Sequence, residues 1–289
     1  MLGIVGIVLV FVMVFGGYIA AGGKLGVIIA ALPYEMAMIG GAAVGAYLIA
    51  NDKSVIRQSM RDFGKIFRGV HWKPDDYRDL LCLLFELIRI ARSNPVALEA
   101  HIENPGESDI FARYPRIRAD HEAVELICDT LRAASMNYDD PHQVEEVLEK
   151  QLEANNHHRQ HTAHALQTVA DALPALGIVA AVLGVIKTMG SIDQPPEILG
   201  KMIAGALVGT FLGVFLAYGF VGPFAQRLGA IAREDAHFYQ LIREVLVANL
   251  HAHPTNICIE VGRQNTPHAL RPSFGELEEA LRGLRQDAA

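Results

Sequence analysis

The chain has 289 residues, of which 51% are hydrophobic and 20% are charged, and its formal net charge is −7. A typical soluble domain is poorer in apolar residues and richer in charge, so this composition excludes an ordinary soluble globular protein. The acidic balance also argues against nucleic acid as a partner, because no basic stripe stands out.

Four apolar blocks hold the excess of hydrophobic residues, at 2–21, 36–50, 173–192 and 202–221. Each is close to the roughly 20 residues that a helix needs to cross a hydrocarbon core of about 30 Å. We therefore expect an all-α, polytopic membrane protein with four transmembrane helices, the second being the shortest. A signal peptide is the alternative for the first block, but no Lys or Arg precedes it and it is long for such a segment, which favours a retained helix.

Basic residues next to membrane helices mark the cytoplasmic side. They follow the second block (Lys53, Arg57, Arg61, Lys65, Arg68) and the fourth block (Arg227, Arg233), whereas Lys24 is alone between the first two blocks. The predicted division is membrane helices 1 and 2 in residues 1–50, a cytoplasmic helical domain in 51–171, membrane helices 3 and 4 in 172–223, and a cytoplasmic helical region in 224–289. Both termini are then cytoplasmic.

The cytoplasmic segments have helical periodicity. Leu80, Leu84 and Leu87 lie on one face of a predicted helix over 75–93, behind a cap at Asp75 or Asp76. A second helix is predicted from Ile117 through Leu131, and a third begins at Pro141 and continues toward the third membrane block. Apolar residues from Leu228 to Leu246 extend the fourth block into the cytosol, and Ser273 with Glu276 has the spacing of a capping box for a last short helix.

Small residues recur at helical spacing inside the membrane blocks: Ala37, Gly41 and Gly45; Gly177, Ala181 and Gly184; Gly205, Gly209, Gly213 and Ala217. Such stripes let helix backbones approach closely. They indicate either helix packing alone or room for an oligomer or an inserted partner helix. Ionisable residues are expected only near block ends, at Glu35, Lys187 and Lys201. Because a proton path needs an acid at membrane depth, either the chain moves no protons or a partner supplies the carboxylate.

Cofactor and metal chemistry has little support. Cys82, Cys128 and Cys258 are scattered, without CxxC spacing, and are read as reduced thiols. His157, His161 and His164 have a spacing that could hold zinc, but no carboxylate or cysteine completes the set, so a solvated helix face is favoured. Phosphate-loop, GxSxG and HExxH motifs are absent from the sequence, and we expect neither an enzyme, a cofactor nor a metal.

Four strings carry a resemblance that spans the whole chain: "HIENPGESDIFARYP" (101–115), "LPALGIVAAVLGVI" (173–186), "VGTFLGVFLAYGFVGP" (208–223) and "RPSFGELEE" (271–279). Together they resemble the MotA family of flagellar motor stator subunits. ExbB and TolQ, which energise outer-membrane processes, are more distant relatives and remain the alternative, but they have three membrane helices and an outside N-terminus. A structural membrane scaffold without an ion path is a further alternative.

The resemblance implies a ring of five subunits in the bacterial inner membrane around two copies of MotB, which contributes the proton-carrying aspartate. Cytoplasmic charges of the ring act on FliG in the rotor. The residues that match the family are Thr210, next to the MotB aspartate, and Pro174 and Pro223, which couple ion flow to conformation. Ala181 stands where sodium-driven relatives often have threonine, which favours protons, although a small packing residue is the simpler interpretation.

Pro174 is expected in the first turn of the third membrane helix, where its missing N–H costs little. The resemblance implies a bend there, opposite Pro223. For the rotor contact, Glu99 matches the family's glutamate, whereas the usual arginine position falls on Ala91; Arg92 is the first choice and Arg89 the second. A solvated helix face is the simpler reading of these charges.

Overall fold

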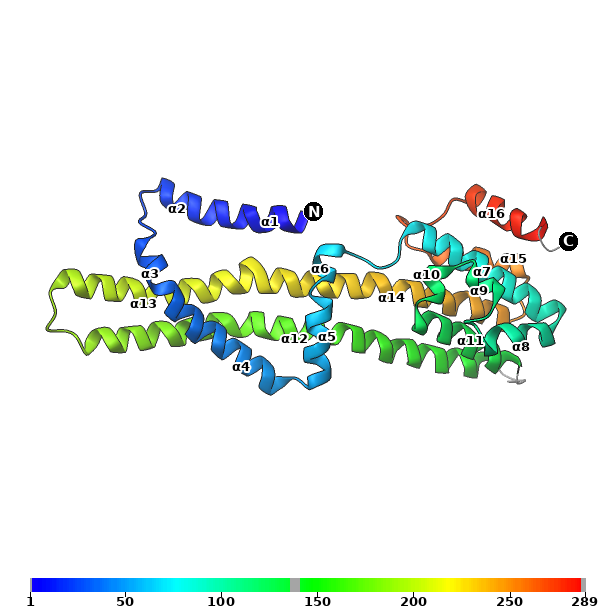
Figure 1. Cartoon of the computed structure of the whole chain (residues 1–289), viewed down its shortest axis with the longest axis horizontal. Helices are drawn as coiled ribbons and strands as arrows, with labels where there is room; N and C mark the ends of the chain where they lie inside the picture. Colours follow the sequence, from blue (N-terminus) through cyan, green and yellow to red (C-terminus); the bar gives the residue numbers. More distant parts are fainter. Residues whose placement is uncertain (1, 136–140, 287–289) are drawn as a thin grey trace. The chain divides into compact units, whose positions relative to one another are not determined.

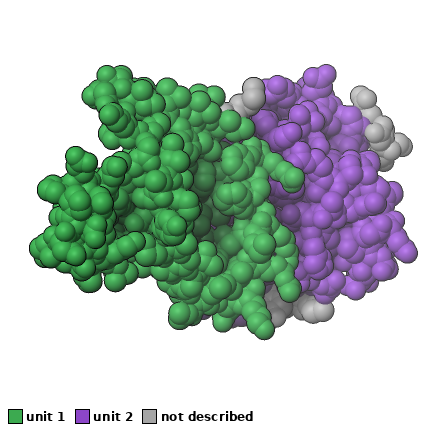
Figure 2. Space-filling view, turned by 60° about the vertical axis from the view of Figure 1, so that its left-hand side comes forward, with its two compact units in different colours: residues 1–69, 158–231 green, residues 70–157, 232–289 purple. Residues whose placement is uncertain are grey.

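A computed structural model of the chain describes residues 2–135 and 141–286, and within these ranges all regular structure is helical, which confirms the all-α prediction (Figure 1). The chain divides into two compact units. Unit 1 contains Met1–Gly69 and His158–Ile231, and unit 2 contains Val70–His157 and Ala232–Ala289 (Figure 2). Two long helices, α12 (Pro141–Met189) and α14 (Gly222–Leu250), contribute to both units.

Four helical stretches in the described residues are long and apolar enough to cross a membrane, as predicted. The first is α1 (Leu2–Phe11), the π-helical turn η1 (Val12–Gly16) and α2 (Gly17–Ala20); the second is α3 (Gly26–Glu35), the π-helical turn η2 (Met36–Gly40) and α4 (Gly41–Ala50). The third lies in α12, and the fourth is α13 (Pro196–Leu216), the π-helical turn η3 (Ala217–Val221) and the start of α14.

The second membrane helix begins ten residues before the predicted block, at Gly26 instead of Met36, so it is not the shortest. The prediction stopped at Pro33 and Glu35 because a proline and a charge interrupt the apolar run. Pro33 nevertheless lies inside α3, since membrane helices tolerate proline where neighbouring groups satisfy the freed backbone. Glu35 is consequently an interior residue of this helix, and the expectation that it lies near the end is wrong.

The third membrane helix does not begin at Pro174. The helix that starts at Pro141, as predicted, continues without interruption to Met189, and Pro174 lies inside it. The first-turn explanation for this proline is therefore wrong. Because proline has no N–H, the carbonyl of Ala170, four residues earlier, lacks its usual helical donor.

The fourth membrane helix contains a π-helical turn directly before its proline. In η3 the N–H of Gly222 reaches back five residues to the carbonyl of Ala217, and Pro223 is the next residue. The wider turn accommodates the position where the α-helical ladder loses a donor, and such single π turns are frequent at functional sites.

Aromatic side chains attach the first membrane helix to the fourth within unit 1. Phe11 and Phe15 have ring centroids 5.7 and 5.4 Å from that of Phe215, in edge-to-face geometry. Toward the other end of unit 1, Phe63 contacts Phe224, with centroids 5.9 Å apart, beside the short helices α5 (Lys53–Asp62) and α6 (Lys65–Arg68). These rings bury large apolar areas and add about 0.5–1.5 kcal/mol per pair.

Unit 2 is built around α7 (Pro74–Ser93), whose apolar residues pack on the inner face of α14 in one continuous core. Trp72, just before α7, is 1% exposed and stacks on Phe238 with ring centroids 3.7 Å apart. The remaining helices are α8 (Pro95–Glu103), α9 (Asp109–Ala112), α10 (Pro115–Arg118), α11 (His121–Ser135), α15 (Thr255–Asn265) and α16 (Phe274–Gln286).

Helix caps explain where unit 2 agrees with the prediction and where it differs. The predicted cap at Asp75 or Asp76 is wrong, because α7 begins at Pro74 and Lys73 is its N-cap; Asp76, inside the first turn, accepts the backbone N–H of Lys73 at 2.7 Å. Ser273 and Glu276 form the predicted capping box. The helix predicted from Ile117 is instead divided into α10 and α11, because Asp120 accepts the N–H of Ala123 at 2.8 Å and starts a new helix. No pattern had indicated α8 or α15.

The three cysteines are free and buried, which agrees with the prediction of reduced thiols. Burial raises the pKa of the Cys82 thiol to about 12 and that of Cys128 to about 12. These thiols therefore stay protonated and are poor nucleophiles and metal ligands.

Candidate functional site

Helices α12 and α13 approach each other through glycine and alanine. A Cβ atom built on Gly213 would lie 2.6 Å from the carbonyl oxygen of Leu173 and 2.9 Å from the Cα of Gly177, and one on Gly184 would lie 2.6 Å from the Cβ of Ala206. These distances are too short for any real side chain. The predicted small-residue stripes are thus a tight helix contact, within this chain, at Gly177, Gly184 and Gly213.

Other members of the predicted stripes do not take part in this contact. Among the residues that the structure describes, Cβ atoms built on Gly41, Gly45 and Gly205 meet no atom within 4 Å. On α12 the buried alanine of the contact is Ala180, whereas Ala181 is half-buried.

Glu35 lies against this contact. Its side chain is buried, with 6% of the residue exposed, and a Cβ atom on Gly209 would lie 2.6 Å from its Oε2 and 3.2 Å from the Cβ of Ala180. Within the described residues, Oε2 has no hydrogen-bond partner. A Cβ at position 209 would displace the carboxyl group of Glu35 from its position against α13.

Glu35 is also deep in its helix. It follows Gly26 by nine residues, which is about 14 Å along the axis, and a hydrocarbon core is about 30 Å thick. An ionisable residue at this depth is costly and marks a functional site by default. The expectation that no membrane block holds a central acid is therefore wrong.

A cavity of about 390 Å³ connects Glu35 with the end of α12. Its lining includes Glu35, Gly205, Lys187 and Thr188. Lys187 and Thr188 are close to Met189, the last residue of α12, and so to the turn that leads into α13. The cavity extends from the buried carboxyl group toward that end of the membrane helices, through a mostly apolar lining.

Pro174 and Pro223, in the third and fourth membrane helices, lie at one level of unit 1. A Cβ on Gly222, next to Pro223, would lie 3.9 Å from the Cβ of Ala170, whose carbonyl lacks its donor because of Pro174. Leu173 and Ala217 belong to the same buried cluster. Two weakened helical turns therefore face each other.

Comparison with known proteins identifies the family to which a chain of this fold belongs. Residues 4–95 match the family described as Motility protein A N-terminal, and residues 119–240 match the MotA/TolQ/ExbB proton channel family. Motility protein A of Salmonella typhimurium is 40% identical over 286 residues, which cover 99% of this chain and 96% of that protein. The chain belongs to the motility protein A family.

Other comparisons agree with this family. Motility protein A of Escherichia coli is 38% identical over 286 residues, covering 99% of this chain and 96% of that protein. The fold resembles a chain of the C. jejuni MotAB structure, with a TM-score of 0.71 and 21% identity over 94% of this chain and 98% of that chain. It also resembles chains of the Bacillus subtilis MotAB stator complex, with a TM-score of 0.68 and 22% identity over 96% and 98% of the two chains.

Two of the membrane-helix residues that were matched to the motility protein A family directly follow residues of the tight contact beside Glu35. Thr210 follows Gly209 on α13, and Ala181 follows Ala180 on α12; both are half-buried. Pro174 is half-buried and Pro223 is exposed. Glu35 is the membrane residue that the sequence pattern had not singled out, and its burial among small residues is what distinguishes it.

The charges matched to the family's rotor contact differ in their surroundings. Glu99 is exposed on α8. Arg92 is also exposed, but its guanidinium donates to Oδ1 of Asn249 at 2.8 Å and to the carbonyl of His253. Arg89 donates to the carbonyl of Leu284 at 3.4 Å. Both arginines therefore hold neighbouring segments of unit 2 together.

The string "HIENPGESDIFARYP" has a structural role in unit 2. Glu86 of α7 is buried and accepts hydrogen bonds from Arg113 and from the Tyr114 hydroxyl, the latter at 2.9 Å. Ser108 caps α9 and contacts Nδ1 of His101 at 2.9 Å. These contacts tie the segment that follows Glu99 to the core.

The predicted histidine cluster is not where metal-ligating groups meet. In residues 2–135 and 141–286, the three-residue group with metal-binding proximity is His142, Glu145 and His251, and not His157, His161 and His164. His142 and Glu145 have i, i+3 spacing, but His251 is distant in sequence, so local spacing could not have found this group.

Proposed function

We propose that this chain is a stator subunit of the flagellar motor and forms, with a MotB partner, a proton-conducting complex that exerts torque on the rotor. The main support is identity of 40% to motility protein A over nearly the full length. The tight contact of α12 and α13, with Glu35 and Thr210 beside it, supplies a polar locus inside apolar helices. The family is not a known enzyme family, and we propose no catalytic role.

MotB would supply the membrane aspartate that carries the proton, and the open faces at Gly41, Gly45 and Gly205 support contacts with MotB and with other copies of this chain. A ring of five copies around two MotB helices in the inner membrane lipid is the proposed assembly. Both termini are assigned to the cytoplasm from the basic residues that follow the second and fourth membrane helices.

Ion flow would be coupled to movement at the level of Pro174 and Pro223. One elementary charge that crosses the membrane releases about 2.3 kcal/mol per 100 mV. This is comparable with the net worth of a few hydrogen bonds, at about 0.5–1.5 kcal/mol each. Turns that already lack backbone hydrogen bonds are where such an energy can change helix direction.

Thr210 provides the direct test of the ion path. Thr210→Val keeps the shape of the side chain and removes the hydroxyl, and we expect it to abolish swimming in cells that have no second stator system, while Thr210→Ser retains it. Swimming speed and membrane levels of the chain are measured together. Normal swimming of the Thr210→Val strain at normal protein level would argue for a structural scaffold without an ion path.

Glu99 provides the test of the rotor contact, with FliG as the proposed partner. Glu99→Lys should strongly reduce torque, because like charges brought together at an interface cost several kcal/mol. Folding should change by no more than about 0.5 kcal/mol, since Glu99 is exposed on the surface. Torque is measured with tethered cells or attached beads.

Glu125→Lys on α11 is the matched control, because Glu125 is an exposed glutamate of the same unit. Equal torque loss in both variants would contradict a specific contact at Glu99. Arg92 and Arg89 remain proposed rotor residues, but their substitution also removes the hydrogen bonds to Asn249 and Leu284, so they are poorer tests.

The MotA/TolQ/ExbB family match keeps an ExbB/TolQ-type energiser as the second candidate function. The neighbouring gene separates the two, because a stator requires a partner with one membrane helix, an early aspartate and a peptidoglycan-binding domain. Ala181 supports protons as the ion. Swimming measured while the sodium and proton gradients are varied separately tests that assignment.

A further inference from the structure

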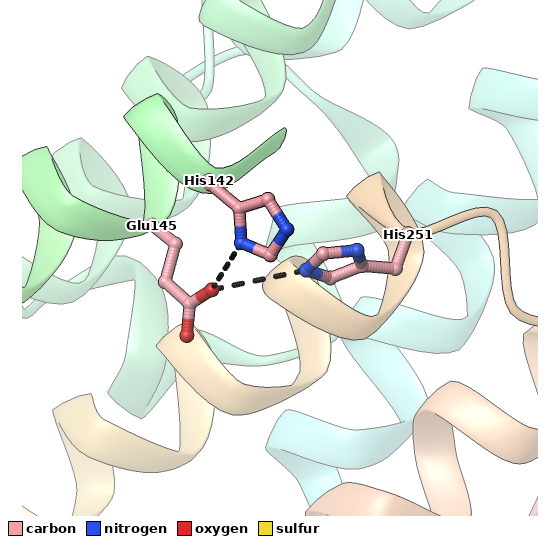
Figure 3. Close-up of side chains that lie close together, drawn as sticks. All are labelled: His142, Glu145 and His251. Atoms are coloured by element: carbon pink, nitrogen blue, oxygen red, sulfur yellow. Dashed lines mark ion pairs between the residues drawn. The ribbon is translucent and has the colours of Figure 1, made fainter. Parts of the chain in front are cut away.

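Three side chains from two helix ends converge in unit 2. His142 and Glu145 lie in the first turns of α12, and His251 directly follows α14. Both imidazole rings face the same carboxylate oxygen: Nδ1 of His142 lies 3.7 Å and Nε2 of His251 lies 3.8 Å from Oε2 of Glu145 (Figure 3). All three ligand atoms are within 4.8 Å of one another.

We propose that His142, Glu145 and His251 form a binding site for Zn²⁺ on the cytoplasmic unit of this protein. In a tetrahedral zinc site with bonds of about 2.1 Å, neighbouring ligand atoms are about 3.4 Å apart. The two nitrogen–oxygen distances of 3.7 and 3.8 Å exceed this value by a few tenths of an ångström. Small side-chain rotations bring them to bonding geometry, and water completes the coordination.

The donor set selects the kind of metal. Two imidazoles and one carboxylate suit zinc and similar transition metals, whereas Ca²⁺ and Mg²⁺ require mainly oxygen ligands. Two histidines with one glutamate are a known three-ligand set for zinc with an open position. The three cysteines are not part of this site, because they are buried and protonated.

Charges around Glu145 favour a cation there. Arg243 lies 3.2 Å from Oε1 of Glu145, whereas the histidines lie against Oε2, and it is 2.6 Å from Glu244. Glu149 is 3.5 Å from the same arginine. Arg243 thereby orients the carboxylate with Oε2 toward the imidazoles, and three glutamates against one arginine leave a local negative charge.

The backbone that carries the ligands is held by the core of unit 2. Val144 and Leu148 of α12 and Leu246 and Val247 of α14 are all buried in one cluster. Ligands on packed helices need little reorganisation when an ion binds. Zinc would join the start of α12 to the end of α14, next to Asn249, where Arg92 is bound.

The test uses the full chain, purified in detergent with an affinity tag that contains no histidine and stripped of metal with a chelator. Zn²⁺ is then titrated against a chromogenic zinc chelator. We expect one zinc ion per chain. His142→Asn and His251→Asn should each weaken zinc binding by about tenfold or more, because even outer-sphere partners of zinc ligands account for about 10–100-fold.

Two controls define the outcome. His268→Asn, an exposed histidine of the same unit, should bind zinc like the unsubstituted chain. In the unsubstituted chain, zinc should protect His142 and His251, but not His268, from modification by diethyl pyrocarbonate read by mass spectrometry. This second measurement needs no substitution and does not depend on variants folding.

The proposal is overturned if the unsubstituted chain takes up no zinc, if His142→Asn and His251→Asn bind zinc as tightly as it does, or if protection maps to His157, His161 and His164 instead. None of these outcomes bears on the stator function, because the titration measures binding and not motility.

Discussion

Glu35→Gln is expected to stop or strongly slow swimming while the protein remains in the membrane at its normal level. Glutamine keeps the volume that fits against Gly209 and Ala180 but cannot exchange a proton. Glu35 lies inside the second candidate membrane helix, beside the α12–α13 contact, and lines a cavity with Lys187 and Thr188. Each 1.36 kcal/mol added to the barrier of a step slows that step about tenfold. A rise of this size in the barrier to proton transfer would therefore lower ion flow about tenfold.

The matched control for this variant is Glu197→Gln, because Glu197 is an exposed glutamate in the first turn of α13. Glu35→Asp, which retains an acid on a shorter side chain, should preserve part of the activity. Swimming speed is compared with protein level and with recovery of the assembled complex. Wild-type speed for Glu35→Gln would show that the buried acid has no role in ion flow.

Gly213→Ala should destabilise unit 1, which contains the four membrane helices. The added Cβ would lie 2.6 Å from the carbonyl oxygen of Leu173 and 2.9 Å from the Cα of Gly177, and both are backbone atoms that no side-chain rotation can move. Helices α12 and α13 must then separate, and overpacking of this kind costs about 1–3 kcal/mol. Thermal unfolding in detergent and protease resistance measure the loss.

Gly200→Ala on the same helix is the matched control, because a Cβ there meets no atom of the described residues within 4 Å. Where the backbone is compatible, glycine to alanine stabilises by about 0.4–1 kcal/mol. The unfolding temperatures of the two variants should therefore shift in opposite directions. A Gly213→Ala protein as stable as Gly200→Ala would contradict the close approach of the helices.

Composition and periodicity could predict four membrane helices, the continuation of the fourth apolar block into α14 and the cap at Ser273, because these depend on local patterns. They failed at Pro33, Pro174 and Asp120 for one reason. A proline or aspartate changes the local preference, but whether the helix continues depends on packing around it. At Pro33 and Pro174 it continues, and at Asp120 a new helix starts.

Local sequence patterns also predicted the candidate site only in part. A four-residue stripe identified the interfacial helices, but it could not distinguish Ala180 from Ala181, since a change of one residue rotates a side chain by about 100° around the axis. Glu35 was placed at the end of a helix because the start of that helix was placed at Met36. The group of His142, Glu145 and His251 depends on tertiary contact between distant segments and has no local pattern.

Trp72 is the chain's single tryptophan, and its ring is stacked on Phe238 inside unit 2. Intrinsic tryptophan fluorescence therefore reports on that unit alone and is silent about the membrane helices. A fluorescence melting curve would record the release of Trp72 into water, whereas circular dichroism would record the loss of all helices. Two transitions that do not coincide would reveal independent unfolding of the units, with no label attached to the protein.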